Sequence, residues 1–238
     1  MRGSATALEW TRLERRIVRC ERCPRLREHC REVARVKRRA FRGETYWGRP
    51  VPGFGDRSAR ILVVGLAPAA HGANRTGRMF TGDSSGDWLF RALHEVGVAS
   101  RPESISADDG LVLSGAFITA GCRCAPPDNK PLPSELLACS GYMDREIELL
   151  AGLRVVVALG KIAWDTVLAR SRRAAPGSLP RPRPAFGHGA EAAVALRKDG
   201  KPVRLLGSYH PSRQNTQTGK LTRPMLRAVL ARAVEVAG

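Results

Sequence analysis

The stretch that decides the fold runs from residue 61 to residue 68 and reads Ile61-Leu62-Val63-Val64-Gly65-Leu66-Ala67-Pro68. Its apolar part, residues 61–66, is short and nearly uninterrupted, which is typical of a parallel strand that is covered on both faces. Three later runs share this character, at residues 116–119, 154–159 and 203–208. Helical patterns accompany the runs, at residues 8–19, 85–96, 134–150, 162–169 and 222–236. The alternation predicts an α/β fold, a three-layer α/β/α sandwich around a four-stranded parallel sheet.

The composition indicates a folded protein that is attracted to polyanions. Hydrophobic residues make up 43% of the 238 residues, enough for one α/β core, so we expect a single domain over residues 1–238. The formal net charge of +18 favours a nucleic-acid partner, although arginine-rich chains also arise from GC-rich coding DNA. No apolar run approaches the ~20 residues that span a bilayer, and residues 1–10 lack a signal-peptide core. We therefore expect a cytoplasmic protein with no membrane contact.

Unusual polar segments follow three of the four expected strands. They are Gly65-Leu66-Ala67-Pro68, Cys122-Arg123-Cys124-Ala125-Pro126-Pro127 and Ser208-Tyr209-His210-Pro211. In open parallel sheets, ligands bind at the carboxyl ends of the strands. The three segments therefore predict one site at that edge of the sheet.

The chain contains six cysteines, which are Cys20, Cys23, Cys30, Cys122, Cys124 and Cys139. Disulfides are not expected in a reducing cytoplasm, so the thiols either bind a metal or are buried. Thiolates select zinc or an iron–sulfur cluster, and the spacing alone leaves zinc, iron–sulfur and merely buried thiols open. Cys122 competes with Cys124 as a ligand because residues two apart on a strand end point the same way. We expect Cys30 to be a spare, buried thiol.

Three segments carry a resemblance to a known family. Residues 65–83 read GLAPAAHGANRTGRMFTGD, residues 210–222 read HPSRQNTQTGKLT, and residues 124–131 read CAPPDNKP. The first two resemble the two motifs of the type-B (family 5) uracil-DNA glycosylases, of the uracil-DNA glycosylase superfamily. The third, with its flanking cysteines, is similar to that family's cluster-binding pattern. The resemblance extends from about Cys20 to the last expected helix.

The resemblance implies a cofactor and an activity. It implies a structural [4Fe–4S] cluster on Cys20, Cys23, Cys124 and Cys139, the first two contributed by the N-terminal segment 8–48. It implies a monofunctional glycosylase that flips uracil out of double-stranded DNA and hydrolyses its N-glycosidic bond, initiating base excision repair. Hypoxanthine, xanthine and ethenocytosine are implied as further substrates. The alternatives are a uracil-DNA binding protein that is non-catalytic or traps DNA covalently, and an electron-transfer iron–sulfur protein.

The chain departs from the related type-A enzymes at two positions. They carry an acidic residue where Leu66 stands and an asparagine where Ala120 stands. Both changes are usual within type B. The water-activating and base-reading residues therefore cannot be carried over from type A.

The expected chemistry assigns roles to four side chains. Asp83 is the candidate for orienting water or stabilising the sugar cation, with Asp87 second; the alternative for Asp83 is a helix N-cap. His210 is the candidate donor to the departing base, against a packed or surface histidine. Asn129 is the candidate reader of the base edge, against a turn residue among prolines. Phe80 is expected to stack on the flipped base, against core packing.

Two further groups complete the expected site. Substrate-binding residues are expected to be Gly65, Ala67, Pro68, Ala69, His71, Gly72, Asn74 and Phe80. DNA-binding residues are expected to be Ser208, Ser212, Arg213, Gln214, Asn215, Thr216 and Lys220. The arginine-rich residues 31–42 are either further backbone contacts or a solvated helix face. We expect a monomer in bacterial or archaeal cytoplasm that is associated with the nucleoid through DNA.

Overall fold

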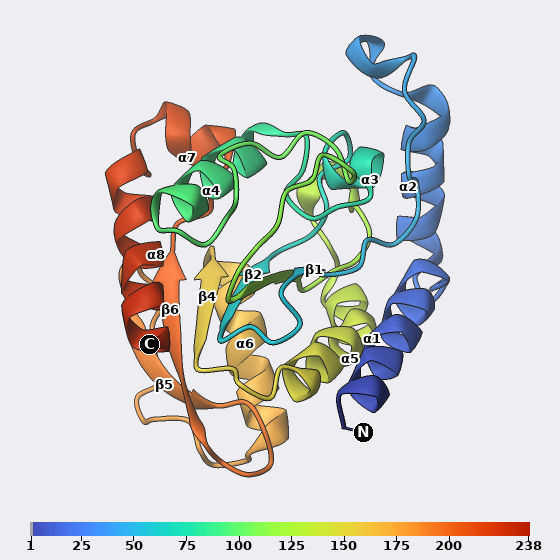
Figure 1. Cartoon of the computed structure of the whole chain (residues 1–238). Coiled ribbons are helices and arrows are strands. Elements are labelled where there is room, and N and C mark those ends of the chain that lie inside the picture. The colour runs from blue at the N-terminus through green and yellow to red at the C-terminus, as the bar shows by residue number, and fades with distance from the viewer. Residues whose placement is uncertain (1) are drawn as a thin grey trace.

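The computed structural model describes residues 2–238 and contains one six-stranded sheet of order β1-β3-β2-β4-β6-β5 (Figure 1). The strands are β1 (Phe54–Gly55), β2 (Ile61–Gly65), β3 (Ala116–Ala120), β4 (Val155–Leu159), β5 (Glu191–Ala195) and β6 (Pro202–Ser208). The four central strands, β3, β2, β4 and β6, pair in parallel. They coincide with the four apolar runs, so the predicted parallel sheet is confirmed.

The sheet has six strands rather than the expected four, because an antiparallel strand closes each edge. At one edge, Phe54 of β1 pairs with Ile118 of β3. At the other edge, Glu191 of β5 pairs with Leu206 of β6. Strand β1 is only two residues long, and β5 follows a proline-rich loop and is exposed at alternate positions. Neither strand therefore shows the continuous apolar run that marks the central strands.

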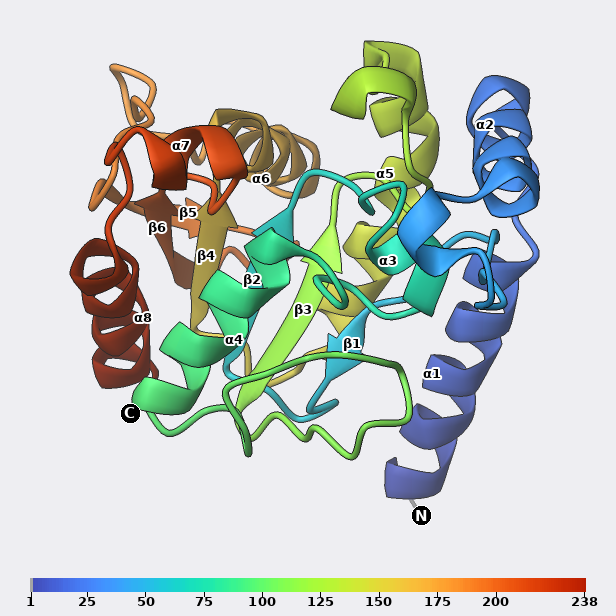
Figure 2. The same cartoon turned by 90° about the horizontal axis from the view of Figure 1, so that it is seen from above.

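Helices cover both faces of the sheet, which confirms the three layers (Figure 2). Helices α4 (Ser84–Glu95) and α8 (Arg223–Ala237) pack on one face, against Ile61 and Val63. Helices α1 (Arg2–Val18), α5 (Pro133–Leu149) and α6 (Lys161–Ala174) pack on the other, against Leu62 and Val64. Alternate residues of β2 thus serve opposite layers, as the two-residue period of a strand requires.

Short helical segments cluster near the carboxyl edge of the sheet. They are α3 (Ala73–Thr76), α7 (Arg213–Gln217) and the 3₁₀ turns η1 (Arg39–Phe41) and η2 (Pro127–Asn129). Helix α2 (Pro24–Val36) begins directly after Cys23. Only its last part, residues 31–36, falls in the segment for which a solvated helix face was one of the two interpretations, and its start was not expected. In the described residues 2–238, none of the helices has the length and apolar character needed to cross a membrane.

Candidate active site

A cavity of about 670 Å³ opens at the carboxyl edge of the sheet. Its wall comes from the loops after β2 and β6, the start of α4 and the η2 turn. Two of the three segments expected at this edge therefore line it, whereas residues 122–127 do not and are followed by the lining residues Asp128 and Asn129. The lining residues are Leu66, Ala67, Pro68, Ala69, Met79, Phe80, Asp83, Ser84, Ser85, Asp128, Asn129, His210, Ser212, Arg213 and Gln214. The three candidate catalytic residues and the candidate stacking residue therefore share one cavity.

Phe80 is held by close backbone packing on two sides. Its φ of 53° lies in the left-handed region, which a bulky residue adopts only when its surroundings enforce it. A Cβ on Gly65 would lie 2.8 Å from the Phe80 ring, and a Cβ on Gly86 would lie 1.8 Å from its carbonyl oxygen. The centroids of the Phe80 and His210 rings are 6.0 Å apart, with 32° between the ring planes. The two glycines thus fix an aromatic ring beside the candidate imidazole.

Asp83 caps helix α4 and also lines the cavity. Its Oδ1 accepts hydrogen bonds from the backbone N–H groups of Ser85 (2.9 Å) and Gly86 (3.0 Å). A Cβ on Gly72 would lie 2.0 Å from Oδ2, so only glycine lets that loop pass the carboxylate. Burial raises the pKa of Asp83 and the nearby Asp87 adds to this, while the two hydrogen bonds oppose it. The helix-cap alternative for Asp83 is thus confirmed, and its catalytic role stays a prediction at a position that lines the cavity.

His210 is a neutral imidazole in the cavity wall. Burial lowers its pKa to about 4, so the ring is uncharged at pH 7. Its backbone carbonyl accepts a hydrogen bond of 2.8 Å from Nδ2 of Asn215, in helix α7. The Ser212 side chain accepts from the backbone N–H of Asn215 and caps that helix. The loop after β6 is thus bound to α7 and keeps the imidazole in place.

Asn129 lies at the exposed mouth of the cavity, in the η2 turn. Asp128 and Asn129 have φ values of 54° and 57°, the left-handed conformation that Asn and Asp adopt more readily than other non-glycine residues. The turn presents the Asn129 side chain on the side of the cavity formed by the segment after β3. The alternative interpretation of Asn129 as a turn residue is therefore compatible with its place in the cavity lining.

Some expected substrate-binding and DNA-binding residues have other contacts. Nδ1 of His71 lies 3.1 Å from the Tyr46 hydroxyl, and burial lowers the His71 pKa. Asn74 is buried and its Nδ2 donates to the carbonyl of Cys30, which binds the first motif to helix α2. Ser208 is buried and donates to the carbonyl of Tyr209. None of these three side chains lines the cavity, so their direct contact with substrate or DNA stays a prediction.

Helix α7 and its flanking residues border the cavity mouth. Arg213 is exposed and its Nε donates to the Ser84 hydroxyl at 3.3 Å, while Gln214 is exposed beside it. Thr216 bonds back to the Ser212 carbonyl, and the Lys220 ammonium lies 4.9 Å from the centre of the Tyr209 ring. The expected DNA-binding segment is therefore on the same rim as the candidate active site.

Sequence reasoning missed five lining residues, which are Leu66, Met79, Ser84, Ser85 and Asp128. Each lies within two residues of a residue that was expected in the site. The available signal was this proximity in sequence, to Ala67 for Leu66 and to Phe80, Asp83 or Asn129 for the others. What the sequence does not contain is the direction of each side chain along an irregular loop.

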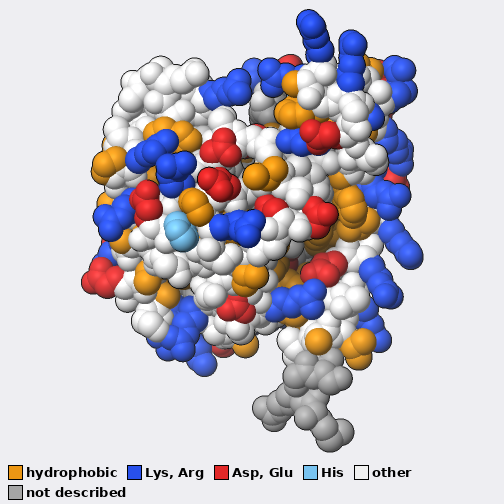
Figure 3. All heavy atoms as spheres, turned by 45° about the horizontal axis from the view of Figure 1, so that its top comes forward, with side chains coloured by type: hydrophobic (Ala, Val, Ile, Leu, Met, Phe, Trp, Pro, Cys, Tyr) orange, Lys and Arg blue, Asp and Glu red, His pale blue; other side chains and the backbone are white. Residues whose placement is uncertain are grey.

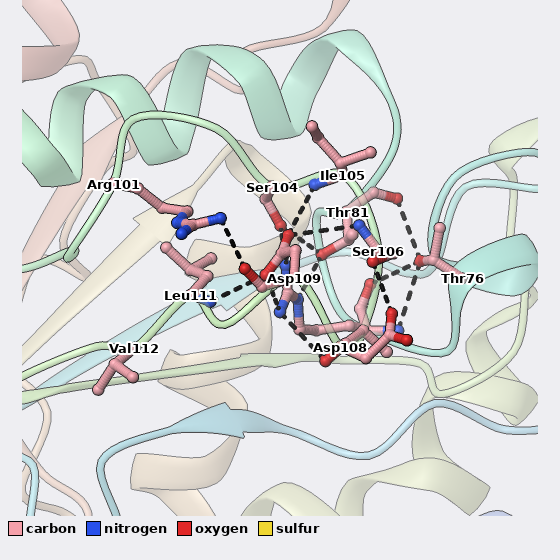
Figure 4. Close-up of polar contacts among 12 residues, drawn as sticks. Thr76, Thr81, Arg101, Ser104, Ile105, Ser106, Asp108, Asp109, Leu111 and Val112 are labelled. Carbon is pink, nitrogen blue, oxygen red and sulfur yellow. Dashed lines mark hydrogen bonds and ion pairs between the residues drawn. The ribbon is translucent and has the colours of Figure 1, made fainter.

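A buried polar network braces the loop that carries Phe80 (Figure 4). Arg78 and Asp109 form an ion pair at 2.5 Å, with side chains that are 5% and 8% exposed. Nε of Arg78 also donates to Thr81 (2.9 Å), and its Nη2 donates to the Ser104 hydroxyl (2.7 Å). Burial acts to raise the pKa of Asp109, but hydrogen bonds from Arg78 and from the Leu111 and Ile105 backbone outweigh it and hold the pKa low. Ser104 and Asp109, in the segment between α4 and β3, thereby hold the part of the first motif that contains Arg78.

Basic side chains gather beside this edge of the sheet. Figure 3 shows Lys and Arg along the side of the molecule formed by α1 and α2. At the end of α2, Arg35, Arg38 and Arg39 are exposed. The backbone N–H of Arg38 donates to the Tyr46 hydroxyl, the group that meets His71. The arginine-rich segment is therefore connected to the loop that forms the cavity wall.

Four cysteines line a second, smaller pocket. Cys20 follows α1, Cys23 precedes α2, Cys124 follows β3 and Cys139 lies in α5. Arg22, Leu26, Arg27, Pro50, Arg123 and Ala138 complete the lining. All six thiols are free. Within residues 2–238, no group of three or more Cys, His, Asp or Glu side chains is spaced to hold a metal ion.

The remaining two cysteines lie beside this pocket and are fully buried. The Cys122 thiol contacts that of Cys139, and the Cys30 thiol contacts that of Cys124. Cys30 packs with Leu26 in an apolar cluster, which agrees with the expectation of a spare buried thiol. The pocket lining thus contains Cys124 rather than Cys122, and the choice between them as a ligand stays a prediction.

Comparison with known proteins identifies the class of this molecule. The family model described as the uracil DNA glycosylase superfamily matches residues 52–233, about three quarters of the chain. The chain therefore belongs to the uracil-DNA glycosylase superfamily, a class of hydrolases that act on N-glycosyl bonds.

Three relatives define its place within that superfamily, and each is named a type-5 uracil-DNA glycosylase. The protein of Thermus thermophilus is 52% identical over 222 residues, covering 93% of this chain and 95% of the relative. That of Mycobacterium tuberculosis is 51% identical over 220 residues, covering 92% and 78%. That of Pyrobaculum aerophilum is 45% identical over 223 residues, covering 94% and 91%. The family is thus the type-5 family, and the resemblance inferred from the motifs is confirmed.

Proposed function

We propose that this chain is a monofunctional DNA glycosylase that excises uracil from double-stranded DNA and so initiates base excision repair. One observation carries the proposal: a half-buried carboxylate, a neutral imidazole and an aromatic ring line a single cavity at the carboxyl edge of the sheet. Cleavage of the N-glycosidic bond calls for a negative group beside the sugar, which gains positive charge, and a donor beside the departing base, which gains negative charge. The aromatic ring offers a stacking face for the extruded base.

The base reaches the cavity by leaving the duplex stack, since its glycosidic bond is inaccessible inside the helix. Phe80 offers a ring face to the extruded base, and such stacking is worth about 1–3 kcal/mol. Gly65 packs against that ring, and Gly86 packs against the Phe80 backbone, so both hold the residue in place before DNA arrives. The cavity is therefore organised to receive a planar base.

His210 donates a hydrogen bond to the oxygen that gains charge as uracil departs. A neutral imidazole suits this task, because the proton stays on the ring and the donor costs no prior ionisation. The pKa of about 4 keeps the ring in that form throughout the neutral range. The bond from Asn215 to the His210 carbonyl holds this backbone in position.

Asp83 acts on the sugar side of the bond. Its carboxylate orients the attacking water or stabilises the oxocarbenium-like sugar, while Oδ1 remains bound to the start of α4. Asn129 faces the base from the cavity mouth, where its amide offers both a donor and an acceptor. That dual character supports a broader range of bases, including hypoxanthine, xanthine and ethenocytosine.

The duplex lies across helix α7 and the adjacent basic surface. Arg213 and Gln214 border the cavity mouth, so they would fill the space that the flipped base vacates. The net charge of +18 supplies the attraction to phosphates, and Lys220 and Ser212 are candidate contacts. The protein acts as a monomer on DNA in the bacterial or archaeal nucleoid.

A [4Fe–4S] cluster bound by Cys20, Cys23, Cys124 and Cys139 is part of the proposal. The four thiols line one pocket together with Arg27 and Arg123, two buried arginines that have donors without acceptors, so the surroundings fit an anionic group. Thiolate ligands are what such a cluster requires. Bound there, it would join the region between α1 and α2 to β3 and α5, a structural role.

The test uses labelled duplexes that carry a single uracil or hypoxanthine. Release of the base with strand breaks only after alkali would support a monofunctional glycosylase. The ratio of the release rates for uracil and hypoxanthine would measure how broad its substrate range is. Binding without release would instead indicate a non-catalytic binder. A protein–DNA adduct that survives a denaturing gel would indicate covalent trapping.

A further inference from the structure

Two buried arginines have side-chain donors without acceptors. Arg27 and Arg123 are only 3% and 1% exposed. Considering all the described residues, Nη1 of Arg27 and both Nε and Nη1 of Arg123 have no hydrogen-bond partner. A buried charged donor without an acceptor is costly, so each such group calls for an explanation.

The other guanidinium nitrogens of Arg27 and Arg123 do have acceptors. Nη2 of Arg27 bonds to the Gly48 carbonyl at 3.2 Å, and its Nε lies 3.4 Å from the half-exposed Glu21 carboxylate. Nη2 of Arg123 pairs with Glu146 at 2.5 Å, while the Thr119 hydroxyl donates to the same carboxylate oxygen. The acceptors present thus occupy one end of each guanidinium and leave the remaining donors without partners.

Both arginines line the pocket that also contains the four cysteines. Arg27 enters it from α2, four residues after Cys23, and Arg123 enters from the loop after β3, next to Cys124. This pocket is the one that the two arginines share, so an anionic acceptor among the thiols would serve the unpaired donors of both. An iron–sulfur cluster with four thiolate ligands is such an acceptor, since its sulfur atoms accept hydrogen bonds.

We propose that Arg27 and Arg123 donate N–H···S hydrogen bonds to the cluster and its cysteine sulfurs, and so set its reduction potential and its resistance to loss. The inference rests on the proposed cluster. Hydrogen bonds to sulfur and nearby positive charge stabilise the reduced, more anionic state, so they raise the potential. Arginine suits the position because its planar fork can bond to protein and cluster together, whereas lysine is a single point charge.

The test compares Arg27→Met with the wild type and with Arg31→Met, after anaerobic purification. Arg31 is a matched control, because it lies on the same helix, pairs with the same Glu21 and is 61% exposed. Arg123 is not the first choice, since its loss would leave Glu146 buried without its charge partner. Iron and sulfide content, the midpoint potential and the rate of absorbance loss in air are measured for each protein.

We expect Arg27→Met to have a lower midpoint potential and a several-fold faster loss of absorbance, and Arg31→Met to match the wild type. Equal potentials and equal lifetimes for both variants would overturn the role of Arg27 while leaving the cluster in place. A wild type that contains zinc, or neither iron nor sulfide, would overturn the cluster itself. If Arg27→Met fails to fold, Arg27→Lys decides: a smaller shift in the same direction supports the inference, and an unchanged potential refutes it.

Discussion

Replacing Asp83 by asparagine removes a charge from the cavity while leaving the start of α4 capped. Oδ1 of the present carboxylate accepts two backbone hydrogen bonds, at 2.9 and 3.0 Å, and an asparagine oxygen can accept the same two. Asn and Asp are about equal as N-caps, so the free energy of unfolding should change by less than about 1 kcal/mol. Asp83→Ala loses the cap as well and should cost about 1 kcal/mol of stability.

The expected effect on the rate is much larger than the effect on stability. A positioned acid–base group contributes about 10²–10⁴-fold, so Asp83→Asn should slow uracil release by that factor, or about 3–5 kcal/mol of barrier. Because burial raises the pKa of Asp83, the acid limb of the wild-type rate profile should lie above the ordinary aspartate value of about 3.9, and the variant should lack it. The raised pKa also means that ionisation of Asp83 lowers wild-type stability as the pH rises through it, a loss that asparagine avoids.

The assay is single-turnover release of uracil from a labelled duplex, measured from acid to neutral pH. Binding of the duplex by anisotropy and thermal unfolding are measured on the same samples. Asp87→Asn is the matched control, since Asp87 lies in the same first turn of α4 but outside the cavity lining. If Asp83→Asn retained a rate within about threefold of the wild type, under 1 kcal/mol of barrier, the assignment of Asp83 to catalysis would be refuted.

Three further predictions concern the cavity and the buried network of Arg78 and Asp109 beside it. Gly65→Ala places a Cβ 2.8 Å from the Phe80 ring and should lower kcat/KM by about tenfold or more, with the fold retained by circular dichroism; an unchanged value would contradict the packing argument. The wild-type rate should show no inflection from His210 near the ordinary histidine pKa of about 6.5, because its pKa is about 4, and a titration of its ring by NMR near 6.5 would count against the neutral donor. Arg78→Met leaves Asp109 without its ion-pair partner and should cost about 3–5 kcal/mol in urea unfolding, whereas a cost below about 1 kcal/mol would show that the brace is unimportant.

The central sheet could be predicted because its signal is local and strong. The run Ile61–Gly65 is fully buried on both faces, and the same is true of β3 and β4, so each strand shows an apolar run in the sequence. The edge strands lack this signal, because β5 is buried only at some positions and β1 has two residues. The start of helix α2 was missed because charged residues dominate its sequence, and only two of its buried residues, Leu26 and Cys30, are apolar.

The candidate site could be predicted in part, because motif residues that follow strands converge by topology. Asp83, Asn129 and His210 belong to three segments and still line one cavity. The orientation of His71 toward Tyr46 could not be read, since it depends on the path of a loop 25 residues earlier. The brace between Arg78 and Asp109 was equally hidden, because a buried ion pair across 31 residues has no periodic signal.

The two antiparallel edge strands affect how the molecule behaves at high concentration. An open sheet edge presents unpaired N–H and C=O groups to which another chain can add, which leads to aggregation. Here one edge is a strand of two residues, and the other carries the charge of Glu191, paired with Arg232 at 2.9 Å. Short and charged edges are devices that prevent such pairing. Copies that accumulate along one DNA molecule would thus remain separate from each other.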